Sequence, residues 1–316
     1  MAMKNCMLPF APVDELALLK RLERPDKPVD VVLDTDTYNE IDDQYALSYL
    51  TLNGDKLRFK AVYAAPFFNH RSESPADGME RSYREICNIL TLLGREELIE
   101  HAFRGSTAYL SDEQTPVISP AAEDLAKRAM EYTPEEPLYV VAIGAITNVA
   151  SALLLNPEIR DRIVIVWLGG HALHWHDNAE FNLRQDVAAA RVVLGCGAAV
   201  VLLPCQGVVS AFSVSAPELR HWLAGKNALC DYLCSSTVEE AESRSKISCW
   251  TRVIWDVTAV AWLLDERFMR DEIISSPIPQ YDDHWSRDQR RHPVRYVYNI
   301  SRDALFEDLF KKLATF

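Results

Sequence analysis

The chain has 316 residues, 48% of them hydrophobic, and a formal net charge of −13. A chain of this length buries about 75% of its unfolded surface, so we expect one large domain over residues 1–316. The acidic balance argues against a nucleic-acid partner, because contacts with phosphates need clustered lysine and arginine. No apolar run approaches the ~18 residues of a membrane span, so no membrane partner is expected.

The cysteines and the N-terminal residues indicate the cellular compartment. Seven cysteines are scattered along the chain without a C-x-x-C pair, which predicts reduced thiols and no zinc site. Asp14 and Glu15 interrupt the first apolar residues, so no signal peptide is expected. Together these features predict a cytoplasmic protein.

Short β-branched runs alternate with helical patterns along the chain. The predicted strands are 29–34, 58–65, 138–144, 163–170 and 199–204, with 101–106 as a further candidate. The predicted helices are 42–52, 78–94, 119–132, 147–155, 186–195, 216–234, 249–265 and 303–314. The polar stretches 66–78 and 281–293 are expected to be loops. This alternation predicts an α/β fold with a mostly parallel, Rossmann-like open sheet flanked by helices.

The stretch VVLDTDTYNEIDDQYAL (31–47) places five acids in ten residues: Asp34, Asp36, Glu40, Asp42 and Asp43. Two carboxylates 4 Å apart repel by roughly 4 kcal/mol at an effective dielectric of about 20. Because ligands bind at the carboxyl ends of parallel strands, something bound there is expected to compensate this repulsion.

Several interpretations of the acidic stretch compete. Asp42 and Asp43 suit a solvated turn that caps the next helix, but Asp34 and Asp36 close an apolar strand. An EF-hand loop fails, because Asn39 stands where the glycine is needed and the twelfth residue is tyrosine. A site for a hard cation remains possible, with some of its oxygen ligands supplied by distant parts of the chain. The D-x-D start of a haloacid dehalogenase-type phosphatase also remains, although five acids fit that pattern poorly.

Four further segments narrow these alternatives. They are FFNH (67–70), VAIGAITNVASALLLNPEI (141–159), LGGHALHWHDNAEFN (168–182) and VIWDVTAVAWLL (253–264). In this order, after DTD…IDDQYAL, they resemble the inosine–uridine-preferring nucleoside hydrolases over about residues 29–264. As a set the motifs are specific. The resemblance implies the α/β fold of that family, a calcium ion and hydrolysis of nucleosides to base and ribose.

The resemblance also implies roles for individual residues. Asp36 is implied to bind calcium and to accept a proton from the attacking water, and Asp43, Asp256 and the carbonyl of Ile143 are implied as further calcium ligands. The residues that resemble ribose ligands are Asp42, Asn69, Glu180 and Asn182, with Phe181 beside them. Asp34 is expected to support this group. Positive charge develops on the sugar in the transition state, and a carboxylate cluster suits it.

The chain departs from the family pattern at the acidic turn and at the late helix. The turn from Thr37 to Glu40 is two residues longer than usual, so Asn39 or Glu40 is expected to reach into the sugar pocket. Trp255 replaces the histidine that many members carry as general acid, and it resembles the tryptophan of purine-preferring members. We therefore expect a purine nucleoside stacked on Trp255.

The missing histidine leaves the leaving-group acid open. His171, His174 and His176 crowd a strand end, and His174 is our candidate. The main alternative is a non-catalytic ribose- or nucleoside-binding protein on the same fold. Because Asp36, Asp43 and Asp256 are all present, we favour the enzyme. The resemblance further implies a homo-oligomer, either a dimer or a tetramer.

Overall fold

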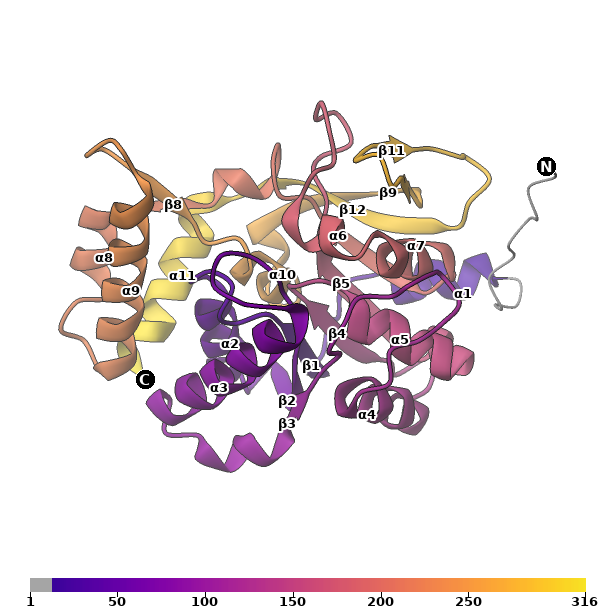
Figure 1. Ribbon diagram of the computed structural model, residues 1–316, viewed down its shortest axis with the longest axis horizontal. Coiled ribbons are helices and arrows are strands. Elements are labelled where there is room, and N and C mark those ends of the chain that lie inside the picture. The colour runs from indigo at the N-terminus through magenta and orange to yellow at the C-terminus, as the bar shows by residue number, and fades with distance from the viewer. Residues whose placement is uncertain (1–12) are drawn as a thin grey trace.

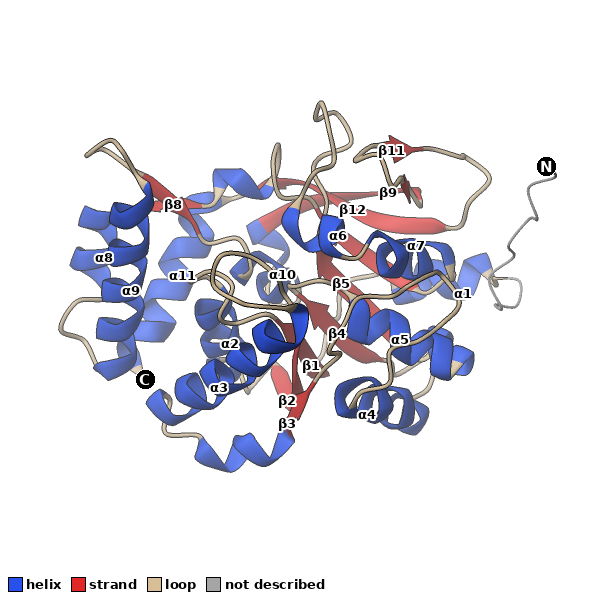
Figure 2. Ribbon diagram, in the orientation of Figure 1, coloured by secondary structure: helices blue, strands red, loops and turns tan. Residues whose placement is uncertain are grey.

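The computed structural model describes residues 13–316 and contains one central sheet with helices on both sides (Figures 1 and 2). The strand order is β3-β2-β1-β4-β5-β6-β12-β9. The strands are β1 (Val29–Thr35), β2 (Leu57–Ala64), β3 (Ala102–Arg104), β4 (Leu138–Ala142), β5 (Ile163–Leu168), β6 (Ala199–Leu203), β9 (Met269–Ser275) and β12 (Pro293–Ile300). All neighbours pair in parallel except β12 and β9. The predicted α/β fold with a mostly parallel sheet is confirmed.

Successive residues of the central strands pack on opposite faces of the sheet. Val31 and Leu33 belong to one buried cluster, and Val32 between them belongs to the other. The first cluster includes α2 (Asp43–Leu52), α3 (Pro75–Leu92), α10 (Val257–Trp262) and α11 (Arg302–Thr315). The second includes α4 (Pro120–Arg128), α5 (Thr147–Leu155) and α7 (Val187–Gly195). Burial on both faces explains why these strands read as nearly continuous apolar runs.

Other short elements complete the chain. They are α1 (Glu15–Arg21), α6 (Phe181–Gln185), β7 (Ser213–Ser215), α8 (Ala216–Trp222), α9 (Ala228–Arg244), β8 (Thr251–Val253), β10 (Ile278–Pro279) and β11 (Trp285–Ser286). Helices α8, α9 and α11 lie together at one end of the molecule (Figure 1). No helix of the described chain combines the length and apolar character that a bilayer crossing requires. The six described cysteines are free, and Cys6 lies outside the described residues.

Two predicted helices differ from the structure. The helix expected over 216–234 is two helices, because Gly225 takes a φ of +74° between them and Asn227 caps the second one. The helix expected over 249–265 begins only at Val257. The residues before it form β8, which pairs antiparallel with β7. The predicted loop over 281–293 also contains the short strand β11.

The strand order reverses at β1, which pairs with β2 on one side and with β4 on the other. Such a reversal opens a crevice at the carboxyl ends of the two strands, where ligands bind in open α/β sheets. The acidic turn follows β1 directly, and the Ile143 N–H donates a hydrogen bond of 2.8 Å to the Asp34 carbonyl. The end of β4 is therefore fastened beside the acids.

Candidate functional site

The acidic turn lies inside the protein. Asp36, Asp42 and Asp43 are 1%, 2% and 1% exposed, so the alternative of a solvated turn is wrong. Asp42 stands at the N-cap of α2, yet its side chain makes no capping hydrogen bond. The carboxylate is therefore not used in helix capping and is left for the interior of the site.

A further carboxylate reaches the turn from the distant helix α10. Asp256 occupies the N-cap of that helix, is 4% exposed, and makes no side-chain capping bond either. Oxygen atoms of Asp42, Asp43 and Asp256 all lie within 4.8 Å of one another. The packing of α10 against α2 brings them together, and both helix N-termini carry partial positive charge toward the cluster. The resemblance assigned Asp42 to ribose, whereas the structure places it in this close carboxylate group.

The environment disfavours the charged form of each of these acids. Burial raises the pKa of Asp43 to about 8, with a further rise from the Asp42 charge. Burial and the nearby Glu40 raise the pKa of Asp42 to about 6. Burial also raises the pKa values of Asp36 and Asp256 well above the ordinary range, and the neighbouring carboxylates add to both shifts. The protein groups around the cluster therefore supply too little positive charge to balance the four carboxylates.

The donor set fits a hard divalent cation. Both Asp36 carboxylate oxygens are buried and have no hydrogen-bond partner, although an unpaired buried charge is costly. The side-chain donors of Asp36, Asp42, Asp43 and Asp256 are all oxygens, which calcium and magnesium prefer over softer metals. The Ile143 carbonyl borders the same cavity and accepts a hydrogen bond of 3.1 Å from Asn182.

Asp34 lies just outside this group. One of its oxygens accepts a hydrogen bond of 2.8 Å from the Asn148 side chain, and the other has no partner. Burial raises the pKa of Asp34 to about 7. Asn148 also accepts hydrogen bonds from Ser106, so it ties α5 and the loop after β3 to the base of the acidic turn. Asp34 thus lies at the base of the turn, where it contacts Asn148.

The acids form the floor of a cavity of about 220 Å³. Its lining is Asp36, Asn39, Glu40, Asp42, Asp43, Ile143, Leu168, His171, Ala179, Glu180, Phe181, Asn182, Cys205, Gln206, Arg252, Trp255 and Asp256. These residues follow β1, β4, β5 and β6 or precede α10, so the cavity opens at the carboxyl edge of the sheet. One cavity thus contains most of the side chains that the sequence singled out.

Glu180 and Asn182 are held rigidly by the backbone. The Glu180 carboxylate accepts hydrogen bonds of 2.8–2.9 Å from the N–H groups of Gly170, Asn182 and Leu183, and so caps α6. The Asn182 amide nitrogen donates to the carbonyls of Ile143 and Leu168, both at 3.1 Å. These bonds occupy its amide donors, and Asn182 lines the cavity, so its side-chain oxygen is an acceptor that a hydroxyl group can use.

The two asparagines near the lengthened turn form a pair. Asn39 is 7% exposed and lines the cavity, and its side-chain oxygen accepts a hydrogen bond of 2.6 Å from Asn69. Asn69 itself is half-buried and lies outside the cavity lining. In this arrangement Asn69 orients Asn39, and Asn39 is the one of the two that a molecule in the cavity would contact.

The aromatic and histidine residues differ in their placement. Trp255 and Phe181 both line the cavity, as an aromatic base requires. His171 also lines it, whereas our candidate His174 is exposed and lies outside the lining. The position of His174 therefore does not support its assignment as the leaving-group acid. His176 is exposed as well.

Sequence reasoning did not name five residues of the lining, which are Leu168, Ala179, Cys205, Gln206 and Arg252. Leu168 ends β5, and Cys205 and Gln206 lie just after the end of β6, so the rule that ligands gather at strand ends would have found these three. Arg252 is the one arginine or lysine among the lining residues of the described chain. The helix predicted over 249–265 was wrong at this position, because Arg252 lies on β8. Nothing in the local sequence pattern indicated its ion-pair partners.

The chain is similar in sequence and in fold to known nucleoside hydrolases. Residues 31–307 match the family described as inosine-uridine preferring nucleoside hydrolase. The pyrimidine-specific ribonucleoside hydrolase RihA of Escherichia coli O1:K1 is 30% identical over 146 residues, or 39% of this chain and 46% of the relative, so the match spans about half of that relative. RihA of Salmonella dublin is 25% identical over 260 residues, covering 74% of this chain and 79% of the relative. The solved purine-preferring ribonucleoside hydrolase from Gardnerella vaginalis superposes with a TM-score of 0.73 and 19% identity, covering 90% of this chain and 98% of that one.

Proposed function

Because the chain belongs to the inosine-uridine preferring nucleoside hydrolase family, we propose that it hydrolyses the N-glycosidic bond of ribonucleosides, with purine ribonucleosides preferred and calcium as its metal. The observation that carries this proposal is the buried group of Asp42, Asp43 and Asp256 beside an Asp36 carboxylate without partners. Such a group is costly to bury unless a cation and a polar substrate complete it. Membership in this family also argues against the phosphatase alternative.

Asp36 is the proposed general base. A carboxylate takes a proton from water when its oxygen lies within about 3 Å, and the partnerless Asp36 oxygens are available for that contact. Asp36, Asp42, Asp43, Asp256 and the Ile143 carbonyl would hold the calcium ion. When bound, that ion would offset the carboxylate repulsion, grip the sugar diol and make a water molecule more acidic.

The remaining polar groups of the cavity are proposed to orient the ribose. The Asn182 oxygen, the Asn39 side chain and the rigid Glu180 carboxylate can each contact a hydroxyl group without moving. As the bond from C1′ to the base nitrogen breaks, positive charge grows on the sugar, and the buried carboxylates stabilise it. No nucleophilic side chain needs to attack the sugar, so inversion at C1′ is expected.

The direct test is release of ribose. Incubating the protein with calcium and inosine, guanosine, uridine or cytidine should release reducing sugar, and faster from the two purine nucleosides. Trp255 and Phe181 provide aromatic surface for the larger base, and each stacked base gains about 1–3 kcal/mol in nucleic-acid binders. The variant Trp255→Ala tests the stacking of the base. It should slow purine hydrolysis far more than it weakens calcium binding.

Two outcomes would contradict this proposal in different ways. Tight nucleoside binding without ribose release would favour the rival, a non-catalytic nucleoside-binding protein. Faster release from uridine and cytidine would retain the hydrolase and remove the purine preference. The pyrimidine-specific names of the bacterial relatives make this second outcome a real competitor.

The leaving base also needs a hydrogen-bond donor, and we propose His171 for it. The Gln206 N–H donates to His171 Nδ1 at 3.3 Å, so the neutral ring carries its hydrogen on Nε2. Burial lowers the pKa of His171, and Asp177, whose carboxylate lies 3.9 Å from Nε2, partly opposes this. His171 lines the cavity, and a neutral ring that donates a hydrogen bond can stabilise negative charge on a departing base.

Replacing His171 with alanine should lower kcat for inosine by about 10²-fold, the usual effect of losing one such donor. His174→Ala is the matched control, and because His174 is exposed outside the cavity it should leave kcat almost unchanged. The effect should nearly vanish for 4-nitrophenyl riboside, whose leaving group departs without such help. Equal losses on both substrates would mean that His171 acts on structure and not on the leaving group.

A further inference from the structure

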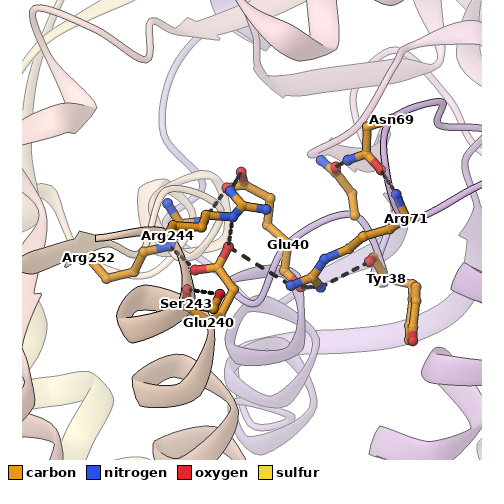
Figure 3. A network of polar contacts seen from close by, with 9 residues as sticks. Tyr38, Glu40, Asn69, Arg71, Glu240, Ser243, Arg244 and Arg252 are labelled. Atoms are coloured by element: carbon orange, nitrogen blue, oxygen red, sulfur yellow. Dashed lines mark hydrogen bonds and ion pairs between the residues drawn. The ribbon is translucent and has the colours of Figure 1, made fainter. Parts of the chain in front are cut away.

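A network of ion pairs joins the lengthened turn to two distant parts of the chain (Figure 3). The Glu40 carboxylate pairs with Arg252 through one oxygen and with Arg244, at 3.2 Å, through the other. Glu240 pairs with Arg244 at 2.8 Å and with Arg252 at 3.3 Å. Both glutamates therefore share both arginines.

The lengthened turn is also held from its opposite side. Arg71, in the loop between β2 and α3, donates hydrogen bonds to the carbonyls of Glu40 and Tyr38 at 3.3 and 3.5 Å. Figure 3 shows Glu40 between Arg71 on one side and the pair Arg244 and Arg252 on the other. The residues that lengthen the turn are thus fixed through both their backbone and their side chain.

The position of Arg252 in the chain connects the ion-pair network to the carboxylate group of the site. Arg252 lies on β8, four residues before Asp256, and Glu40 lies two residues before Asp42. The pair between them therefore links the two segments that supply the carboxylate group of the site. Arg252 is only 16% exposed and Glu40 is 27% exposed, so water screens this pair less than an ion pair at the surface.

We propose that the Glu40–Arg252 pair is a clasp that holds the acidic turn and the start of α10 together, and so assembles the cation site. Arg252 is then a positioning residue that acts through Glu40. This inference rests on the proposed function only in taking the carboxylate group to be a cation site. The clasp opposes the mutual repulsion of Asp42, Asp43 and Asp256, which drives the two segments apart when no cation is bound.

The clasp predicts a loss of cation affinity. In Arg252→Gln, calorimetric titration with calcium alone should give a Kd about 10–100-fold weaker, the usual effect of removing a group that orients metal ligands. Arg252→Lys keeps the charge and should recover part of that loss. The matched control is Arg244→Gln, because Arg244 touches the same two glutamates but lies on α9, away from Asp256. Its Kd should stay within about twofold of the wild type.

Three outcomes would overturn the clasp. An unchanged calcium Kd in Arg252→Gln with a raised KM for inosine would make Arg252 a substrate contact, and the proposed function would stand. A lower melting temperature with an unchanged Kd would make the pair merely structural. A wild-type protein that binds no calcium would remove the cation site itself, and with it both the clasp and the calcium-dependent mechanism. If Arg252→Gln fails to fold, the same titration on Glu40→Gln decides, because Glu40 is the more exposed partner.

Discussion

Asp36→Asn should lower kcat for nucleoside hydrolysis by about 10²–10⁴-fold, the usual contribution of a positioned general base. The amide keeps the size of the side chain but cannot accept a proton from water. Assays at saturating calcium and inosine separate this loss from weaker binding of either one. If kcat falls less than tenfold while the metal is bound, another group is the base.

Stability should move in the opposite direction in this variant. Burial and the charges of Asp43, Asp42 and Glu40 all disfavour an ionised Asp36, so removing its charge relieves repulsion in the metal-free protein. The melting temperature without calcium should therefore be equal to or higher than that of the wild type. Loss of activity together with retained or increased stability is the pattern expected of a residue that is kept for function and not for folding.

Asp34→Asn is the matched control, because Asp34 is also buried and stands two residues earlier, near the end of β1. Its carboxylate accepts a hydrogen bond from Asn148, so it has a structural partner that Asp36 lacks. We expect kcat to fall by less than about tenfold, below the range for a general base. Comparable losses in the two variants would point to disruption of the turn in general.

The sequence predicted the part of the fold that is buried on both faces. Strands β4, β5 and β6 are continuous apolar runs, β1 and β2 are apolar over most of their length, and each was expected within a few residues of its observed bounds. Strand β9 was missed, because its sequence MRDEIIS is largely polar, as an edge strand of a sheet can be. Strand β12 was missed with it, because its sequence PVRYVYNI begins with proline and mixes polar with apolar residues.

The sequence likewise predicted some residues of the candidate site and not others. Asp36 and Asp43 could be singled out because they belong to a dense acidic stretch after an apolar strand, whereas Glu180 and Asp256 were implied by the family resemblance. The role of Arg252 could not, because an ion pair across more than two hundred residues leaves no trace in local periodicity. The choice among the three histidines also needed coordinates, since adjacent positions in a loop differ in burial without any regular pattern.

Removing the metal should abolish the reaction and restoring calcium should recover it. Prolonged treatment with a chelator, followed by exchange into metal-free buffer, is expected to reduce ribose release from inosine to background. The cause is the mutual repulsion of Asp42, Asp43 and Asp256, because without a cation nothing balances their charges or holds the sugar diol. Titrating calcium back should restore kcat, while sodium at equal ionic strength should not.

Calcium should also stabilise the fold, and this readout does not depend on catalysis. A ligand at 100 times its Kd stabilises the native state by about 2.7 kcal/mol, which raises the melting temperature by several degrees. In Asp256→Ala, which removes the carboxylate that α10 contributes to the group, most of this rise should be lost, and activity with it. Asp177→Ala, at a partly exposed carboxylate outside the cavity lining, should keep the full rise. If the chelated protein still hydrolyses inosine at the wild-type rate, the buried aspartates act on the sugar directly and the metal-dependent mechanism is wrong.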